Sequence, residues 1–302
     1  MLPVSLSIKA SRIRFRLLFC LLAIIVNGAF GAQSKQLTLR KFIKLDSLTV
    51  NRAIAITCGK TGEIYLLDNF QSQVTIIEVE SLEFGRYQPG FAVMGNATDI
   101  ASDGGTGILV CDPFQSIFAH LSRTGSPLPE IALDPAFRLQ AVSIASLRDG
   151  RVLLYNRNDN NLWRMERDGK ATRLTFGNRS RAARNLKLEI SPDQRRIYLL
   201  QGAEVSVFSA EGATLSPVAG SLEEPAGIAV TDQGLWLAGD GVEFIPTNPD
   251  WKSYKLPPDS LLDWDIPAVA DIAIDGETLF LLAAQGSRIA VLNIITTEVE
   301  QP

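Results

Sequence analysis

Three charged residues, Asp99, Lys187 and Asp271, each stand directly before a short apolar segment of the chain. Carboxylates and an ammonium group that a fold brings together can bind a polar ligand, and such clusters are a common marker of functional sites. The three residues lie far apart in the sequence. A shared site therefore depends on the elements that place these apolar segments beside one another.

The apolar segments belong to a repeat. Segment 66–72 (LLDNFQS) recurs 44 residues later as segment 110–116 (VCDPFQS), and weaker similarity continues to the C-terminus. Short runs that alternate Ile, Val or Leu with small residues recur at intervals of 40 to 46 residues. Their first members are Ile54, Ile100, Val142, Leu188, Ile228 and Ile272. Each run is followed by a second and a third strand pattern and, less regularly, a fourth.

A β-type repeat of this period predicts the blades of a β-propeller, which have about four strands each. We therefore expect an all-β, six-bladed β-propeller in which the six runs are the innermost strands. The sixth unit lacks a clear fourth strand. Segment 36–45 (QLTLRKFIKL) alternates apolar and polar residues, and we predict that it supplies the outer strand of the last blade and closes the ring.

Residues 1–31 have the layout of a secretory signal peptide. Four basic residues precede the apolar run 17–26, and small residues follow it without any acidic residue. The apolar run is shorter than the ~20 residues that a membrane-spanning helix needs. We expect export to the periplasm or the extracellular space, no membrane insertion after cleavage, and a monomeric domain over residues 32–302.

The net charge argues against one class of partner, and the cysteine content bears on whether a disulfide forms. Loss of residues 1–31 leaves 25 basic against 33 acidic residues, a net charge of −8, which argues against nucleic acid as a partner. Cys58 and Cys111 would remain, and export permits a disulfide between them. The repeat places them at opposite ends of strands in neighbouring blades. We interpret both as packed thiols, with a bridge as the alternative.

Several segments resemble the NHL-type repeats of six-bladed propellers. The resemblance rests on Gly62–Asp68, Gly107–Asp112 and Gly150–Asn156, and on the lead-in Glu224–Val230. It covers the residues after 31, although blades four to six lack the Asp of this motif. Binding is the commonest role in that family, and a minority of its members are enzymes. The resemblance alone does not choose between the two.

In this topology the innermost strands begin on the face that carries the turns between second and third strands. Asp99, Asp271 and Lys187 would then surround one mouth of the channel, the default ligand site. Propeller lactonases similar to this family hold a divalent cation with carboxylate and amide oxygens. By that resemblance Asp99 and Asp271, with Asn51 and Asn185, could bind Ca²⁺. The competing interpretation is that the Asp residues only solvate the channel, and we predict no cofactor.

Two loop regions on the same face could bind a partner. One, between blades three and four, is basic and contains Arg179, Arg181 and Arg184. The other, between blades five and six, contains Trp264 among several Asp residues. Charge complementarity and aromatic stacking would suit a protein or peptide. Solvated loops without a partner are the alternative.

The sequence allows more than one role for two phenylalanines and for the only histidine. Phe70 and Phe114 of the repeated turn either pack between blades or stand exposed as anchors for a partner, and general burial trends favour packing. The only histidine, His120, falls in a predicted third strand away from the axis. This position argues against His-ligated zinc or copper and against a Ser-His-Asp triad at the channel mouth.

Together these patterns favour a binding or scaffold module that acts through its loop face, for which a protein or peptide is the expected partner. The alternatives are a divalent-cation-dependent hydrolase or lactonase at the channel mouth and a purely structural module.

Overall fold

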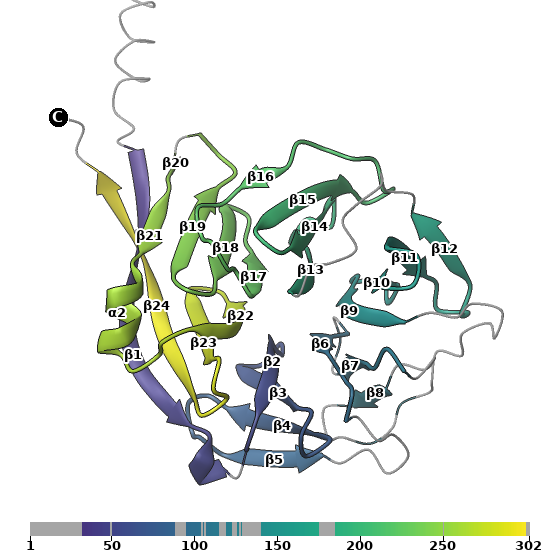
Figure 1. Ribbon diagram of the computed structural model, residues 1–302, viewed down its shortest axis with the longest axis horizontal. Coiled ribbons are helices and arrows are strands. Elements are labelled where there is room, and N and C mark those ends of the chain that lie inside the picture. The colour runs from purple at the N-terminus through teal and green to yellow at the C-terminus, as the bar shows by residue number, and fades with distance from the viewer. Residues whose placement is uncertain are drawn as a thin grey trace, which may run out of the picture.

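The computed structural model describes residues 32–48, 50–87, 95–103, 105, 107–114, 119–122, 126, 128, 140–174, 185–249 and 251–299. Their strands form six sheets that stand like blades around a central axis (Figure 1). This arrangement confirms the all-β, six-bladed β-propeller. In this part of the chain no helix has the length and apolar character needed to span a membrane.

The innermost strand of each blade contains the apolar run expected from the repeat. These strands are β2 (Ala53–Cys58), β6 (Asp99–Ser102), β9 (Ala141–Ser146), β13 (Leu186–Ile190), β17 (Gly227–Val230) and β22 (Val269–Asp275). The second strands pair antiparallel with them. They are β3 (Glu63–Asp68), β7 (Gly107–Cys111), β10 (Val152–Asn156), β14 (Arg196–Gln201), β18 (Gly234–Ala238) and β23 (Thr278–Ala283).

The third strands continue each antiparallel sheet outward. They are β4 (Gln73–Glu78), β8 (Ala119–Ser122), β11 (Asn161–Met165), β15 (Glu204–Ser209), β19 (Val242–Pro246) and β24 (Arg288–Val299). Blades one, three, four and five add outer strands, which are β5 (Phe84–Tyr87), β12 (Ala171–Leu174), β16 (Val218–Ala219) and β21 (Tyr254–Leu256). The expected fourth strand of blade two, at residues 130–133, lies outside the described residues.

The sheet of the last blade contains strands from both ends of the chain. Its order is β20-β1-β24-β23-β22, with β1 at Ala32–Lys44 and β20 at Trp251–Lys252. β1 runs antiparallel to β24, and the pairing is irregular only between Leu39 and Lys41. β20 pairs parallel with the start of β1. Residues 36–44 thus form hydrogen bonds with the C-terminal strand.

The hydrophobic core is divided among the interfaces between blades. Six clusters of buried apolar side chains each join two adjacent sheets. Both faces of a sheet are covered, so the second strands are apolar at nearly every position instead of alternating. Small residues such as Ala55 and Ala229 stand on the innermost strands, where the sheets come closest together. The clusters fix each blade against its neighbours.

Both described cysteines are free thiols. Cys111 is fully buried in β7 between blades two and three, and burial raises the pKa of its thiol. Cys58 ends β2 and is partly exposed. The expectation of unbridged thiols is confirmed.

The pairing of β1 leads to a test of ring closure. Leu37 of β1 is only 8% exposed and packs in the cluster between blades five and six. Leu37→Ala should lower the free energy of unfolding by about 2 kcal/mol, because it removes buried methyl groups and leaves a cavity. Urea denaturation measures the change. Thr38→Ala, at the exposed neighbouring position, is the control, and an equal loss in both variants would contradict the packing role of β1.

Candidate functional site

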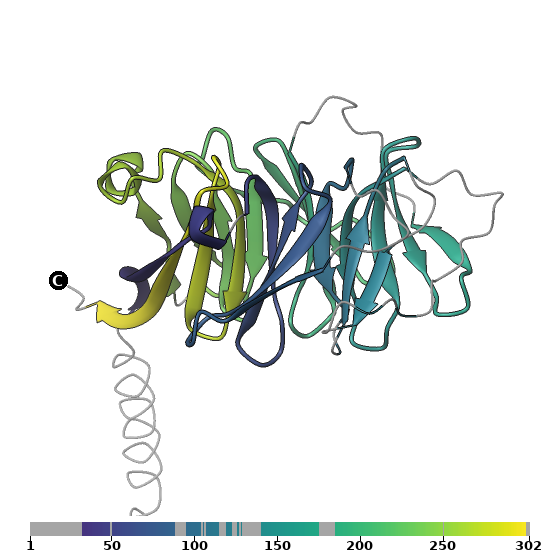
Figure 2. The ribbon, with the colours of Figure 1, turned by 90° about the horizontal axis from the view of Figure 1, so that it is seen from below.

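The propeller has two distinct faces. We define the upper face as the one on which the innermost strands begin. It lies at the upper edge in Figure 2 and carries the short helix α2 (Pro258–Asp263). The turns between second and third strands also lie on this face. The lower face carries the turns between first and second strands. Candidate site residues are therefore divided between two mouths of one channel.

A buried ionic bridge spans the channel near its upper mouth. The Lys187 ammonium lies 2.8 Å from Asp99 Oδ1 and 2.7 Å from Asp271 Oδ2. The three residues belong to blades two, four and six, so one lysine side chain joins alternate blades across the axis. We call this arrangement the channel bridge. The structure thus brings together the three residues that sequence analysis placed at the channel mouth.

The two carboxylates also satisfy the free edges of the innermost strands. Asp99 Oδ2 accepts hydrogen bonds from the Ser143 hydroxyl (2.5 Å) and from the Ile144 amide (3.1 Å). Asp271 Oδ2 accepts a bond from the Ile56 amide, also at 3.1 Å. An innermost strand has no neighbouring strand on the channel side, so its amides need other acceptors. Each Asp supplies one to the next blade in the ring.

Electrostatics favours the charged form of the lysine. Burial alone would lower the pKa of the Lys187 ammonium, but the adjacent carboxylates of Asp271 and Asp99 outweigh it and raise this pKa. Burial raises the pKa of Asp271, and the nearby Asp99 carboxylate acts in the same direction. Two carboxylates share one ammonium, so the bridge carries one uncompensated negative charge.

The donor set does not fit the divalent cation that the lactonase resemblance implied. The Lys187 ammonium already lies between the two carboxylates that would be its ligands. The Asn185 amide donates to the Pro225 carbonyl oxygen at 3.2 Å, in the neighbouring blade. Among the residues the structure describes, no three His, Cys, Asp or Glu side chains gather as a metal-binding group would require.

Below the bridge the channel wall is also acidic. Glu189 stands on the same side of β13 as Lys187, two residues further along the strand. Burial, with help from the Asp99 and Asp271 carboxylates, raises the pKa of Glu189 to about 8. Burial also raises the pKa of the Cys58 thiol, and the carboxylates of Asp275 and Glu189 add to this effect. The potential in this part of the channel is therefore negative.

The repeated turn is held in place by its aspartate. Asp68 is fully buried at the end of β3, and its two oxygens accept four backbone hydrogen bonds. Two come from Asn51 and Arg52, before the innermost strand, and two from Phe70 and Gln71 in the turn. Each is 2.9 to 3.1 Å long. One carboxylate thus ties the turn to the adjacent strand.

The next two blades carry related contacts. Asp112 Oδ1 accepts a bond from the Phe114 amide at 2.8 Å, and Asn156 Oδ1 accepts bonds from the Gln140 and Asn158 amides. The aspartate of the repeated motif therefore stabilises the turn.

The expectation that the two turn phenylalanines pack between blades is wrong. Phe70 is 73% exposed and Phe114 is 76% exposed on the upper face. The turn amides donate hydrogen bonds to the buried aspartates and so hold the backbone in place while both rings stand in solvent. Exposed phenylalanines on adjacent blades are candidates for partner contact.

An upper cavity of about 410 Å³ opens beside these turns. Its lining combines amides, cations and one phenylalanine. The polar and aromatic residues that line it include Asn69, Asn96, Phe114, Arg157, Asn185 and Lys187. The floor of the cavity is thus one member of the channel bridge, and its rim includes an exposed aromatic ring.

Other predicted site residues are not part of this cavity. Trp264 follows α2 and packs, partly buried, against the core cluster between blades five and six. It is not among the described residues that line the upper cavity. Arg179, Arg181 and Arg184 lie outside the described residues, so the predicted basic patch stays a prediction.

Sequence reasoning missed several polar partners. Ser143 joins the bridge through its contact with Asp99, and a serine in an alternating apolar strand was the only signal. His120 lies in the third strand β8, as expected, but its Nε2 is 3.0 Å from Asp103 Oδ2 on the lower face. That contact joins a third strand to a distant turn, which no local pattern predicts.

Comparisons with known proteins show the fold. No protein-family model and no curated protein matches the chain. Among solved structures, virginiamycin B lyase from Staphylococcus aureus has a TM-score of 0.58 at 14% identity, covering 86% of this chain and all of that one. A protein of unknown function from Bacteroides thetaiotaomicron has a TM-score of 0.66 at 13% identity, covering 87% of this chain and 76% of its own.

A further neighbour is the PQQ-bound aldose sugar dehydrogenase from Streptomyces coelicolor. Its TM-score is 0.59 at 14% identity, and the match covers 88% of this chain and all of that chain. The neighbours thus include a lyase, a dehydrogenase and a protein without a known role. At these identities the likeness shows a shared propeller fold and transfers no activity.

Removal of the bridging ammonium should destabilise the fold. Lys187→Met leaves two buried carboxylates without a counter-ion, and we expect the free energy of unfolding to fall by about 3 kcal/mol near neutral pH. The unpaired carboxylates should then have folded-state pKa values above those of the unfolded chain. The loss should therefore shrink as the pH is lowered. Urea denaturation at several pH values measures both effects.

Lys170→Met is the matched control, because Lys170 forms an exposed ion pair with Asp168. We expect no measurable change in that variant. Equal stability of the two variants would contradict the bridge as a structural tie.

Glu189 should make stability depend on pH. Its folded-state pKa of about 8 exceeds the ordinary value of 4.5, so folding favours the protonated form. The associated stability is fully present below about pH 4.5 and is lost as the pH rises through about 8. Glu189→Gln should flatten this decline, whereas Glu211→Gln at an exposed turn should not. Thermal melts across this window measure the difference, and equal slopes in wild type and Glu189→Gln would contradict the assignment.

Proposed function

We propose that this protein is an exported, NHL-like β-propeller that binds a protein or peptide through its upper face. The observation that carries the proposal is that Phe70 is 73% exposed and Phe114 is 76% exposed, on adjacent blades. Aromatic side chains that stand exposed on neighbouring turns are common anchors in binding interfaces.

The turns that hold these rings are already ordered. Asp68 fixes its turn with four backbone hydrogen bonds, and Asp112 repeats the contact to Phe114. A preorganised turn loses little conformational entropy when a partner binds, so more of the contact energy contributes to affinity. The same carboxylates that shape the fold thus support presentation of the rings.

The upper cavity complements the two rings. Asn96 and Arg157 are exposed at its rim, and Asn185 is partly buried beside Lys187. Amide and guanidinium groups can bond the carbonyl oxygens of an extended peptide, while the rings contact its apolar side chains. A partner segment with a large apolar residue next to exposed backbone fits this surface.

The cellular setting in the proposal rests on sequence. Residues 1–31 have the three-part pattern of an export signal, and the remaining chain carries a net charge of −8. An acidic surface away from the upper cavity favours solubility and disfavours nucleic acid. We therefore place the binding activity in the periplasm or outside the cell, with the propeller as a monomer.

A peptide-display selection tests the proposal. A random library is selected on the purified protein, and the affinity of the enriched synthetic peptides is measured by calorimetry. We expect Phe70→Ala and Phe114→Ala each to weaken binding about tenfold, as loss of an interface anchor does. Phe84→Ala is the matched control, because Phe84 is exposed at the start of β5, at the end of that strand away from the upper face. Peptides that bind all variants equally would refute the proposal.

A further inference from the structure

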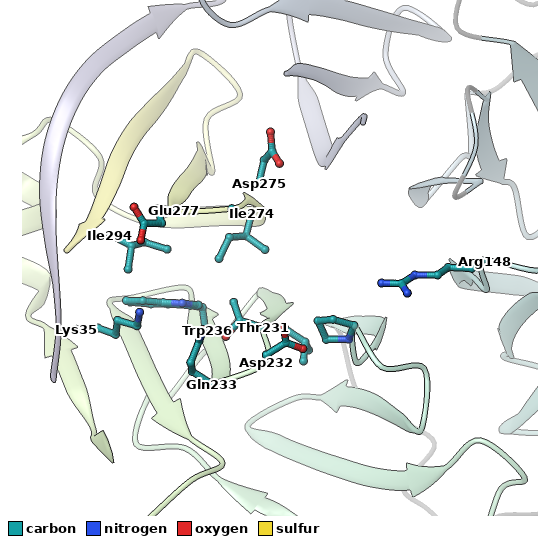
Figure 3. A pocket seen from close by; sticks show the side chains of 13 residues that line it. Lys35, Arg148, Thr231, Asp232, Gln233, Trp236, Ile274, Asp275, Glu277 and Ile294 are labelled. Atoms are coloured by element: carbon teal, nitrogen blue, oxygen red, sulfur yellow. The ribbon is translucent and has the colours of Figure 1, made fainter. Parts of the chain in front are cut away.

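The lower mouth of the channel opens into a second, larger cavity. Its volume is about 670 Å³, within the range of roughly 300–1,000 Å³ typical of small-molecule sites. Among the described residues, it shares no lining residue with the upper cavity. Figure 3 shows its walls, which come from turns of blades three, four, five and six and from β1. This cavity has no role in the upper-face function.

Part of its charge is already compensated. Lys35 of β1 donates from Nζ to Thr296 Oγ1 at 2.8 Å, and its ammonium lies 4.5 Å from the centroid of the Trp251 ring. Burial lowers the pKa of Lys35, and the opposing influence comes from the Glu277 carboxylate. The charges of Lys35 and Glu277 therefore interact with each other at the outer end of the cavity.

The charges nearer the channel remain available. Asp232 and Asp275 are exposed on the turns of blades five and six, and Arg148 is exposed on the turn of blade three. In the part of the chain that the structure describes, none of these three side chains forms an ion pair or a hydrogen bond. Figure 3 shows Arg148 across the open space from Asp232 and Asp275. Opposite charges thus face each other over a cavity instead of forming a contact.

The lining around these charges mixes polar and apolar side chains. Thr231 and Gln233 contribute polar groups, whereas Ile274 and Pro192 contribute apolar surface. The negative field on the acidic side extends into the channel, since the Asp275 carboxylate contributes to the raised pKa of Cys58. A ligand that matches these charges carries a cation at one end and a carboxylate at the other, and its middle contacts both polar and apolar side chains.

We propose that the lower cavity binds a short peptide with both termini free. Its terminal ammonium pairs with Asp232 and Asp275, its terminal carboxylate pairs with Arg148, and its side chains contact Ile274 and Pro192. Both charged ends of the peptide are needed, because each forms an ion pair with a charged side chain of the cavity that otherwise has no partner of opposite charge. A volume of 670 Å³ accommodates a peptide of a few residues. The inference is independent of the upper-face function.

The test uses one tripeptide, Ala-Leu-Ala, in four end states: unmodified, N-acetylated, C-amidated and modified at both ends. Calorimetry with the purified protein should show saturable binding of the unmodified peptide. Each single modification should weaken it about tenfold, as loss of one charge-assisted contact does. Absence of binding by the unmodified peptide, or equal binding of all four forms, would overturn the proposal.

Variants assign each end of the peptide to its side of the cavity. Asp232→Asn with Asp275→Asn should abolish discrimination between free and acetylated peptide, and Arg148→Gln should abolish discrimination between free and amidated peptide. The matched control is Asp259→Asn with Asp263→Asn, which changes the net charge equally on the upper face. Phe70→Ala should bind the tripeptide as wild type does, so failure here is distinguishable from failure of the upper-face proposal. Equal weakening by the control pair would show a diffuse charge effect and overturn the assignment.

Discussion

The channel depends on the ion pairs that the Lys187 ammonium forms with Asp99 and Asp271. Six sheets converge on the axis, and each presents an innermost strand whose channel-facing amides lack a partner strand. Asp99 and Asp271 accept bonds from two of these strands, and Lys187 is the counter-ion that the two buried carboxylates share. A buried carboxylate without a counter-ion is costly, so the lysine makes the other contacts possible. The same residue forms the floor of the upper cavity.

This arrangement gives one scaffold two chemically different faces. The upper face combines exposed rings with amide and guanidinium groups, whereas the lower mouth combines separated acidic and basic side chains with a mixed polar and apolar lining. Both faces consist of turns on rigid strands, where side chains can vary without disturbing the cores between blades. The two proposals therefore follow from one principle: groups that the fold holds without a partner are available to a ligand.

The repeat also shows how structural and functional signals can coincide. Asp68 bonds the turn to the innermost strand, and Asp112 and Asn156 make related contacts in the next blades. Blades four and six end their second strands in Gln201 and Ala283 and lack this carboxylate. The aspartate explains the motif as turn chemistry, yet its hydrogen bonds also hold Phe70 in solvent. One residue type thus serves the fold and presents a candidate anchor.

Much of this protein could be predicted from its sequence. The six apolar runs, their spacing and the strand order follow from local alternation and repeat period, which depend only on neighbouring residues. The convergence of Asp99, Lys187 and Asp271 also followed, because equivalent repeat positions must meet at the axis.

Only the tertiary structure decided what those residues do together. Whether two carboxylates hold a cation or a lysine depends on the reach of one side chain across the channel. The exposure of Phe70 depends on the hydrogen bond from its backbone amide to the buried carboxylate of Asp68. The contact of His120 with Asp103 joins a third strand to the turn between the first two strands. The lower cavity likewise combines residues from four blades and β1. Such contacts are set by distances in space, which the order of residues along the chain does not contain.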